Sequence, residues 1–314
     1  NDDRNIVFDV TDTSLQPNML WSARRDSADN LSLYDSVRGD GKELRTAETG
    51  AQYDRSDNIQ ALNSNGFQVG TDGQVNASGG TYVSWAWKES ATAGFDILTF
   101  EGNSTDDTDI SHNLSAVPHW IICRNIDSAK DWCVYHHKNT SAPETDLLVL
   151  NTTAATSDSN DKWSDEAPTS SVFTVGDSSQ LNASGDTSIA FLWSEKQGYS
   201  KFGTYEGNNN ASGPYIYLGF KPAWFMTKKS NGSKDWNIYD NKRSDSGGGN
   251  PNDQYLEANT NGAEQSGQDI DFLSTGVKIR STSSEVNGDD NNFIYMAFAE
   301  SPLVNSNGVP NNAE

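Results

Sequence analysis

One block of sequence that occurs three times constrains this chain most, because a fixed period of self-similarity determines the architecture. Each copy begins at a Pro and reaches a Tyr 17 residues later. The three starting residues, Pro17, Pro118 and Pro222, lie 101 and 104 positions apart. The two clearest copies share Lys-Asp-Trp at Lys130 and Lys234. A period of this length is the size of one small domain.

Two further blocks keep the same register. One block has a Leu, a polar stretch and an Ala at identical spacing, in Leu44–Ala51, Leu148–Ala155 and Leu256–Ala263. The other ends each copy on an aromatic-rich segment, in Asn76–Glu89, Asn182–Glu195 and Asn287–Glu300. We therefore predict three units, residues 1–90, 91–197 and 198–314, the last with a C-terminal tail.

A segment that opens a unit is found only twice, as Gly94–Asn103 and Gly198–Asn208. The first unit has no such segment, so it has either lost the opening strand or replaced it with residues 1–16. The chain starts Asn-Asp-Asp-Arg without a basic region leading into an apolar stretch, so no signal peptide is visible. We expect that Asn1 is not the true start of the gene product.

The closing segments alternate between apolar and polar residues, which is typical of half-buried β-strands. Val83, Trp85 and Trp87 share one face of the first such segment. In the third copy Phe293 and Tyr295 make the other face apolar too, so we expect that strand to be covered on both sides.

Each Pro-to-Tyr block predicts a hairpin with a four-residue polar turn, Asp127–Lys130 in the second copy. No stretch has convincing helical periodicity. The predicted fold is all-β, with three tandem antiparallel β-sandwich repeats of jelly-roll type.

Charge excludes several partners. The chain has 22 Lys and Arg against 44 Asp and Glu, a net charge of −22 and a pI near 4.4, whereas nucleic-acid-binding domains are normally basic. Its apolar runs are far shorter than the roughly 18 residues that a spanning helix needs, so we predict no membrane insertion.

A mean hydropathy of −0.72 leans towards disorder, but 9 Trp, 11 Tyr and 12 Phe indicate a folded chain.

Several groups of residues are candidates for a catalytic or metal site, and each also has a structural interpretation. The four histidines (His112, His119, His136 and His137) could form a metal site or an acid/base pair, but Asp35 and Asp240 stand where His136 does in the other copies. Packing or surface histidines are the favoured interpretation. Cys123 and Cys133 lie on opposite strands of the predicted hairpin, and buried free thiols are favoured over a disulfide.

Acidic clusters at 106–109, 158–166 and 289–290 could supply oxygen ligands to Ca²⁺, but none has the loop spacing of an EF-hand. Solvated acidic loops are favoured, so we predict no cofactor and leave only Ca²⁺ open. The chain has no Gly-x-Ser-x-Gly, no phosphate-binding Gly loop and no His-Glu-x-x-His, and we predict that it is not an enzyme. The paired tryptophans Trp120, Trp132, Trp224 and Trp236 could stack on sugars, but we expect them in the core.

The blocks also resemble a repeated domain family of marine bacteriophage virion proteins. The resemblance runs from about Pro17 to Leu303, with the family's blocks in order. The segments that carry it are Tyr34–Gly39, Asn76–Lys88, Leu150–Thr156, Trp163 with Ala167–Phe173, Gly198–Asn208, Tyr217–Met226 and Ile294–Leu303. It implies a structural protein of the particle surface with lectin-like jelly-roll folds, and it supplies no catalytic residues.

From this resemblance we predict a phage virion surface protein, most directly a tail fibre or appendage in host attachment. Its expected partners are copies of itself in a homotrimer, other virion proteins, and a host glycan or outer-membrane protein. A capsid decoration and the non-catalytic carbohydrate-binding region of a secreted glycanase are the alternatives. If the chain binds glycan, Trp163 is the predicted contact, because it lies in the loop Asp158–Pro168 and has no plain counterpart in the other copies.

Overall fold

The computed structural model describes residues 2–8, 15–244 and 249–300. The predicted C-terminal tail, 301–314, and parts of the predicted opening region, residues 1 and 9–14, lie outside the described residues. Apart from the single-turn helices α1 (Gly73–Asn76) and η1 (Pro143–Thr145), the regular elements are strands, so the all-β prediction is confirmed. Within this part of the chain no helix is long and apolar enough to cross a membrane.

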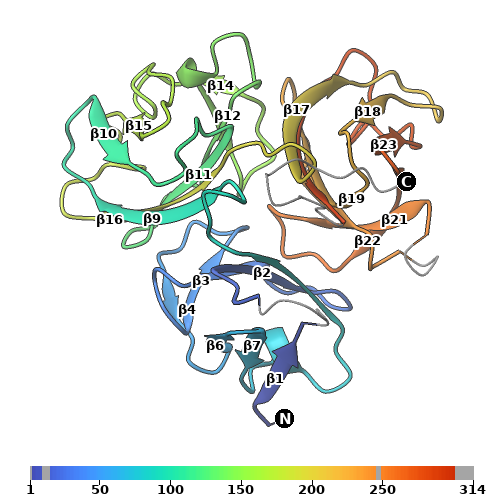
Figure 1. The fold of residues 1–314 in the computed structure, drawn as a ribbon, viewed down its shortest axis with the longest axis horizontal. Helices are drawn as coiled ribbons and strands as arrows, with labels where there is room; N and C mark the ends of the chain where they lie inside the picture. The colour runs from blue at the N-terminus through green and yellow to red at the C-terminus, as the bar shows by residue number, and fades with distance from the viewer. Residues whose placement is uncertain (1, 9–14, 245–248, 301–314) are drawn as a thin grey trace.

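The strands form three groups that surround a common centre (Figure 1). The closing segment of each repeat, such as Asn76–Glu89, forms one strand, which we call the closing strand. We call the sheet that contains this strand the inner sheet of its group, and the sheet that covers it the outer sheet. The first group has the inner order β5-β4-β3-β2-β8 and the outer order β1-β7-β6. These strands are β1 (Arg4–Val7), β2 (Met19–Arg24), β3 (Ser32–Asp35), β4 (Lys42–Arg45), β5 (Tyr53–Asp54), β6 (Ile59–Asn63), β7 (Gly66–Val69) and β8 (Tyr82–Trp87).

The second and third groups repeat this plan with one more inner strand. The second group has the inner order β14-β13-β12-β11-β16-β9 and a β10-β15 outer pair, and the third forms one sheet, β17-β24-β19-β20-β21-β22-β23-β18. The strands of the second group are β9 (Phe95–Glu101), β10 (Thr108–Ser111), β11 (Trp120–Asn125), β12 (Cys133–His136), β13 (Asp146–Val149), β14 (Ser157–Asp158), β15 (Val172–Val175) and β16 (Thr187–Trp193). Those of the third are β17 (Ser200–Glu206), β18 (Tyr215–Tyr217), β19 (Pro222–Lys229), β20 (Trp236–Asp240), β21 (Asn252–Glu257), β22 (Gln265–Leu273), β23 (Gly276–Ile279) and β24 (Asn292–Ala299).

The three inner sheets bury one face against each other in a shared central core. Eight of the nine tryptophans lie in this core, and all three groups contribute to it: Trp21, Trp85, Trp87, Trp120, Trp132, Trp193, Trp224 and Trp236. The opposite faces pack in three separate clusters: on the outer sheets in the first and second groups and, in the third group, on strands β22, β23 and β18 of the same sheet. Each inner sheet is therefore covered on both sides.

The closing strands show where the sequence interpretation was incomplete. β16 and β24 are almost entirely buried, whereas only Trp85 and Trp87 are buried in β8. The expectation of half-buried strands is wrong for β16, because the central core covers one face and the outer sheet the other. The predicted hairpin of β11 and β12 is present, but its connection runs from residue 126 to residue 132 rather than over four residues.

One backbone hydrogen bond repeats around the ring and joins the three groups into a closed cycle. The Gln52 amide donates to the Ile126 carbonyl over 2.8 Å, and the Thr156 amide donates to the Ser230 carbonyl over 2.8 Å. The equivalent Glu264 amide donates to the Arg25 carbonyl over 2.9 Å. The first group thus contacts the second, the second the third, and the third the first.

Candidate functional site

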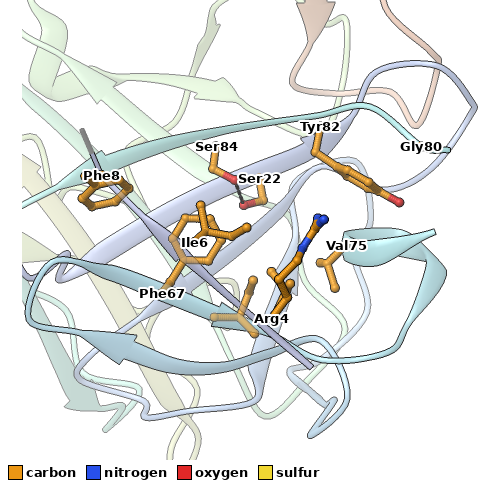
Figure 2. Close-up of a pocket in the computed structure, with 11 residues that line it drawn as sticks. Arg4, Ile6, Phe8, Ser22, Phe67, Val75, Gly80, Tyr82 and Ser84 are labelled. Carbon is orange, nitrogen blue, oxygen red and sulfur yellow. Dashed lines mark hydrogen bonds between the residues drawn. The ribbon is translucent and has the colours of Figure 1, made fainter. Parts of the chain in front are cut away.

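A cavity of about 420 Å³ lies between the two sheets of the first group and is the first candidate site (Figure 2). Its wall is mainly apolar, with Ile6 and Phe8 at the N-terminal segment and Phe67 on β7. Polar atoms come from the Arg4 guanidinium and from hydroxyls on β2 and β8. The Ser22 and Ser84 hydroxyls bond each other over 2.7 Å.

The polar groups of this cavity do not form a catalytic arrangement. The Tyr82 hydroxyl donates to the Gly73 carbonyl over 2.7 Å and accepts from the Ala77 amide over 2.6 Å. No carboxylate, thiol or imidazole is among the eleven lining residues. The cavity is therefore suited to hold apolar groups rather than to activate a nucleophile.

A second hollow, a cleft of about 530 Å³, lies where the first and third groups meet. It runs along β8, mainly against the face that carries Trp85 and Trp87, and it shares Tyr82 and Ser84 with the first cavity. Its wall combines the polar residues Asp240, Asn241 and Lys242 with aromatic rings. The Trp87 ring lies edge-on to Trp224 and Phe298, each with centroids 5.6 Å away. The Trp85 indole donates to the Asp240 carboxylate over 3.0 Å. Two hollows therefore flank β8, mainly on its opposite faces.

Buried ion pairs beside the central core repeat at equivalent places in the first and third groups. Arg38 donates to Asp35 over 2.5 Å, and their side chains are 1% and 0% exposed. Arg243 pairs with Asp240 in the same way and also contacts Glu264 over 2.8 Å. The second group has His136 and Asn139 at these positions. The Asp-to-His exchange seen in the sequence therefore replaces a packed ion pair by a neutral ring.

Three histidines gather where the second group meets the third. The His119 and His137 rings lie edge-on with centroids 4.4 Å apart, and the His137 imidazole bonds the Phe202 carbonyl over 3.1 Å. His136 is buried and stands edge-on to Trp120. Burial lowers the pKa of His137 to about 4, and it lowers the pKa of both His119 and His136. Among the described residues no group of three or more His, Cys, Asp and Glu is placed to hold a metal ion.

This histidine cluster predicts a loss of stability in mild acid. Histidines with a lowered folded pKa bind fewer protons than the unfolded chain, so the free energy of unfolding falls as pH drops from about 6.5 towards 4. His137→Gln keeps a donor for the Phe202 carbonyl but cannot titrate in this range. We expect the free energy of unfolding to fall between pH 7 and 4.5 by about 2 kcal/mol less in this variant than in the unsubstituted protein. Urea unfolding at both pH values measures this, and equal losses would contradict it.

The structure corrects the prediction for Trp163. Its side chain is 2% exposed and its indole donates to the Asp146 carbonyl over 3.1 Å. The ring packs edge-on to Tyr135 in the core of the second group. A sugar cannot stack on a buried ring, so the expectation of an exposed loop aromatic is wrong here. The polar residues around Trp163 in sequence gave no sign that its ring packs on Tyr135 and bonds the backbone of β13.

The other candidates have packing roles. Trp120, Trp132, Trp224 and Trp236 are buried, as expected for core residues. Cys123 and Cys133 face each other across β11 and β12 as buried free thiols, and burial raises the pKa of both. The acidic segments 106–109 and 158–166 approach each other through Ser164, whose hydroxyl donates to Asp106 over 2.8 Å. The same hydroxyl accepts from the Asp107 amide over 3.2 Å, and these two contacts do not make a cation site.

Two exposed aromatic side chains were missed by sequence reasoning. Tyr215 and Tyr217 on β18 are 45% and 62% exposed, while Ile216 between them is buried. Lys201 lies 5.4 Å from the centre of the Tyr217 ring. The alternation in Pro214–Leu218 was a signal for outward-facing rings, but the strand is only three residues long.

Comparison with known proteins gives one match. A family described as "Domain of unknown function (DUF7483)" matches residues 4–302, which is almost the whole chain. No curated protein matches, and no solved structure matches.

Proposed function

Because this chain belongs to the DUF7483 family, whose function is not assigned, we propose its function from its own residues. The proposal is a non-catalytic structural protein of a bacteriophage particle surface, in the form of a tail fibre or other appendage that takes part in host attachment. The observation that carries it is the ordered set of repeated blocks from Pro17 to Leu303, which resembles marine phage virion proteins.

The packing of the titratable groups supports a non-catalytic role. Catalytic groups with shifted pKa values normally face a cleft. Here the groups with the strongest shifts, among them Cys123, His136 and Tyr239, are enclosed by the cores and contacts between groups. Their shifts follow from burial within the fold.

The surface supports display on a particle in salt water. A net charge of −22 keeps a densely displayed protein soluble, and salt screens the repulsion between exposed charges. The outward-facing Tyr215 and Tyr217 offer rings on which a host sugar or a side chain of an outer-membrane protein could pack. These two exposed rings support a role in attachment, for which the buried Trp163 offers no contact.

Immunogold electron microscopy of purified particles, with an antibody raised against residues 1–314, tests the proposal. We expect label at the distal tail or on an appendage. Label over the head would instead indicate a capsid decoration or fibre. Unlabelled particles together with free protein in the medium would favour the carbohydrate-binding region of a secreted glycanase and would overturn the virion proposal.

A further inference from the structure

The free edge of β8 distinguishes the first group from the other two. In the second group all seven residues of β9 pair with β16, from Phe95 opposite Trp193 to Glu101 opposite Thr187. In the third group β17 pairs with β24 in the same way. Among the described strands β8 pairs with β2 alone and ends its sheet.

The N-terminal strand does not occupy this edge. β1 pairs with β7 in the outer sheet, with Ile6 opposite Phe67. The equivalent pair in the second group is β10 with β15, with Ile110 opposite Phe173. Residues 4–7 therefore take the place of β10, and the sequence alternative in which residues 1–16 replace the opening strand is wrong for these four residues.

The cavity of the first group lies where the other groups insert side chains of their opening strand. In the second group Phe100 of β9 packs edge-on to Phe173 with centroids 6.1 Å apart. In the third group Tyr205 of β17 stacks on Phe293 at 4.8 Å. Phe67, the counterpart of Phe173, lines the 420 Å³ cavity together with Tyr82 and Ser84 of β8.

The cleft on the other face of β8 has the same origin. Phe95 and Ile97 of β9 and Phe202 of β17 point the opposite way and are buried in the central core. The Phe202 ring packs against Trp120 and Phe298, with centroids 6.2 and 6.1 Å away. The first group has no described residue in this role, and the 530 Å³ cleft opens beside β8 instead.

We propose that the β8 edge accepts an antiparallel β-strand with the pattern of β9 and β17, supplied by polypeptide outside residues 1–314. Such a strand would place alternate apolar side chains into the cavity and the cleft and would pair with the β8 backbone. A small apolar ligand would fill one hollow and leave the backbone edge unpaired. The β9 and β17 strands of a second copy are already paired with β16 and β24, so a second copy would have to give up its own sheet.

The repeat fixes how a test protein is built. Six residues separate Glu101 from Thr108, the first residue of β10. If Gly94–Ser104 is added directly ahead of Asn1, six residues also separate the added Glu from Arg4, the first residue of β1. The control is the same fusion with Leu98→Asp and Phe100→Asp in the added copy only, because these side chains would enter the cavity.

Hydrogen–deuterium exchange and thermal unfolding of the full chain give the readout. We expect the fusion to slow amide exchange in residues 82–87 about tenfold or more and to raise Tm by about 5 °C, and the Asp control to do neither. The Gly94–Asn103 peptide added in excess should protect the same residues. Unchanged exchange in 82–87 with both the fusion and the peptide would overturn the proposal.

Two further measurements exclude other occupants of the edge. A chain that ends at Glu300 should show unchanged exchange in residues 82–87, and faster exchange there would mean that the chain's own tail covers β8 and that the proposal is wrong. Exchange should also be independent of protein concentration. Protection of 82–87 that grows with concentration in the absence of peptide would assign the edge to a second copy and overturn the proposal as well.

Discussion

Trp236→Ala is expected to lower the free energy of unfolding by about 4 kcal/mol, the scale for removing a large aromatic ring from a tightly packed site. The Trp236 side chain is 0% exposed and lies edge-on to Trp120 of the neighbouring group. Its indole also donates to the Val149 carbonyl over 3.1 Å, so the substitution leaves a cavity and an unpaired acceptor at an interface between groups. Guanidinium unfolding followed by fluorescence and circular dichroism measures the loss.

Matched variants separate the contributions. Trp236→Phe keeps most of the ring and should lose about 1 kcal/mol for the hydrogen bond. Trp132→Ala should match Trp236→Ala, because Trp132 makes the equivalent bond to the Arg45 carbonyl over 3.1 Å. Tyr217→Ala removes an exposed ring and should change stability by less than about 0.5 kcal/mol. A Trp236→Ala loss no larger than that of Tyr217→Ala would contradict the shared core.

Arg38→Asn is expected to lower the free energy of unfolding by about 3 kcal/mol or more, because it leaves the Asp35 carboxylate buried without its cation. The Arg38 guanidinium bonds both that carboxylate and the Leu33 carbonyl. The chain itself suggests the compensating change. The second group has His136 and Asn139 at these two positions, with His136 buried and Asn139 half-buried.

The double variant Asp35→His, Arg38→Asn should therefore be more stable than the sum of the two single losses predicts, by about 1 kcal/mol or more. Arg38→Lys serves as the control for charge, because it keeps the cation but loses the fork that reaches two acceptors. Unfolding of the unsubstituted protein, the two single variants and the double variant under one condition gives the coupling energy between the two positions. Strictly additive losses would show that the two positions do not act as a pair.

The all-β class and the closing strands could be predicted from the sequence because repeated blocks reinforce one another. Alternation placed Trp85 and Trp87 on one face, and both lie in the central core. The sequence did not reveal what covers that face, since alternation shows that a face is apolar and not which element packs on it. For the same reason Trp163 was assigned to an exposed loop and β16 to a half-buried strand.

The candidate site was less accessible to sequence reasoning than the fold. The missing opening segment of the first unit was visible as a gap in the repeat. Its consequence, two hollows on opposite faces of β8, depends on how Phe67 and Trp224 approach that strand from different sheets. Such positions arise from tertiary packing, and neither residue has a local pattern that distinguishes it from any other core aromatic.

The closed cycle of hydrogen bonds from Gln52, Thr156 and Glu264 has a consequence for counting molecules. A ring of three similar parts is usually built from three identical subunits, and each substitution then appears three times. Here one polypeptide completes the ring, so each contact between its parts can evolve separately, as Arg25 with Glu264 has done at one of the three. A single copy of this chain therefore closes a ring of three similar groups by itself, and a substitution in it changes one of the three contacts and leaves the other two unaltered.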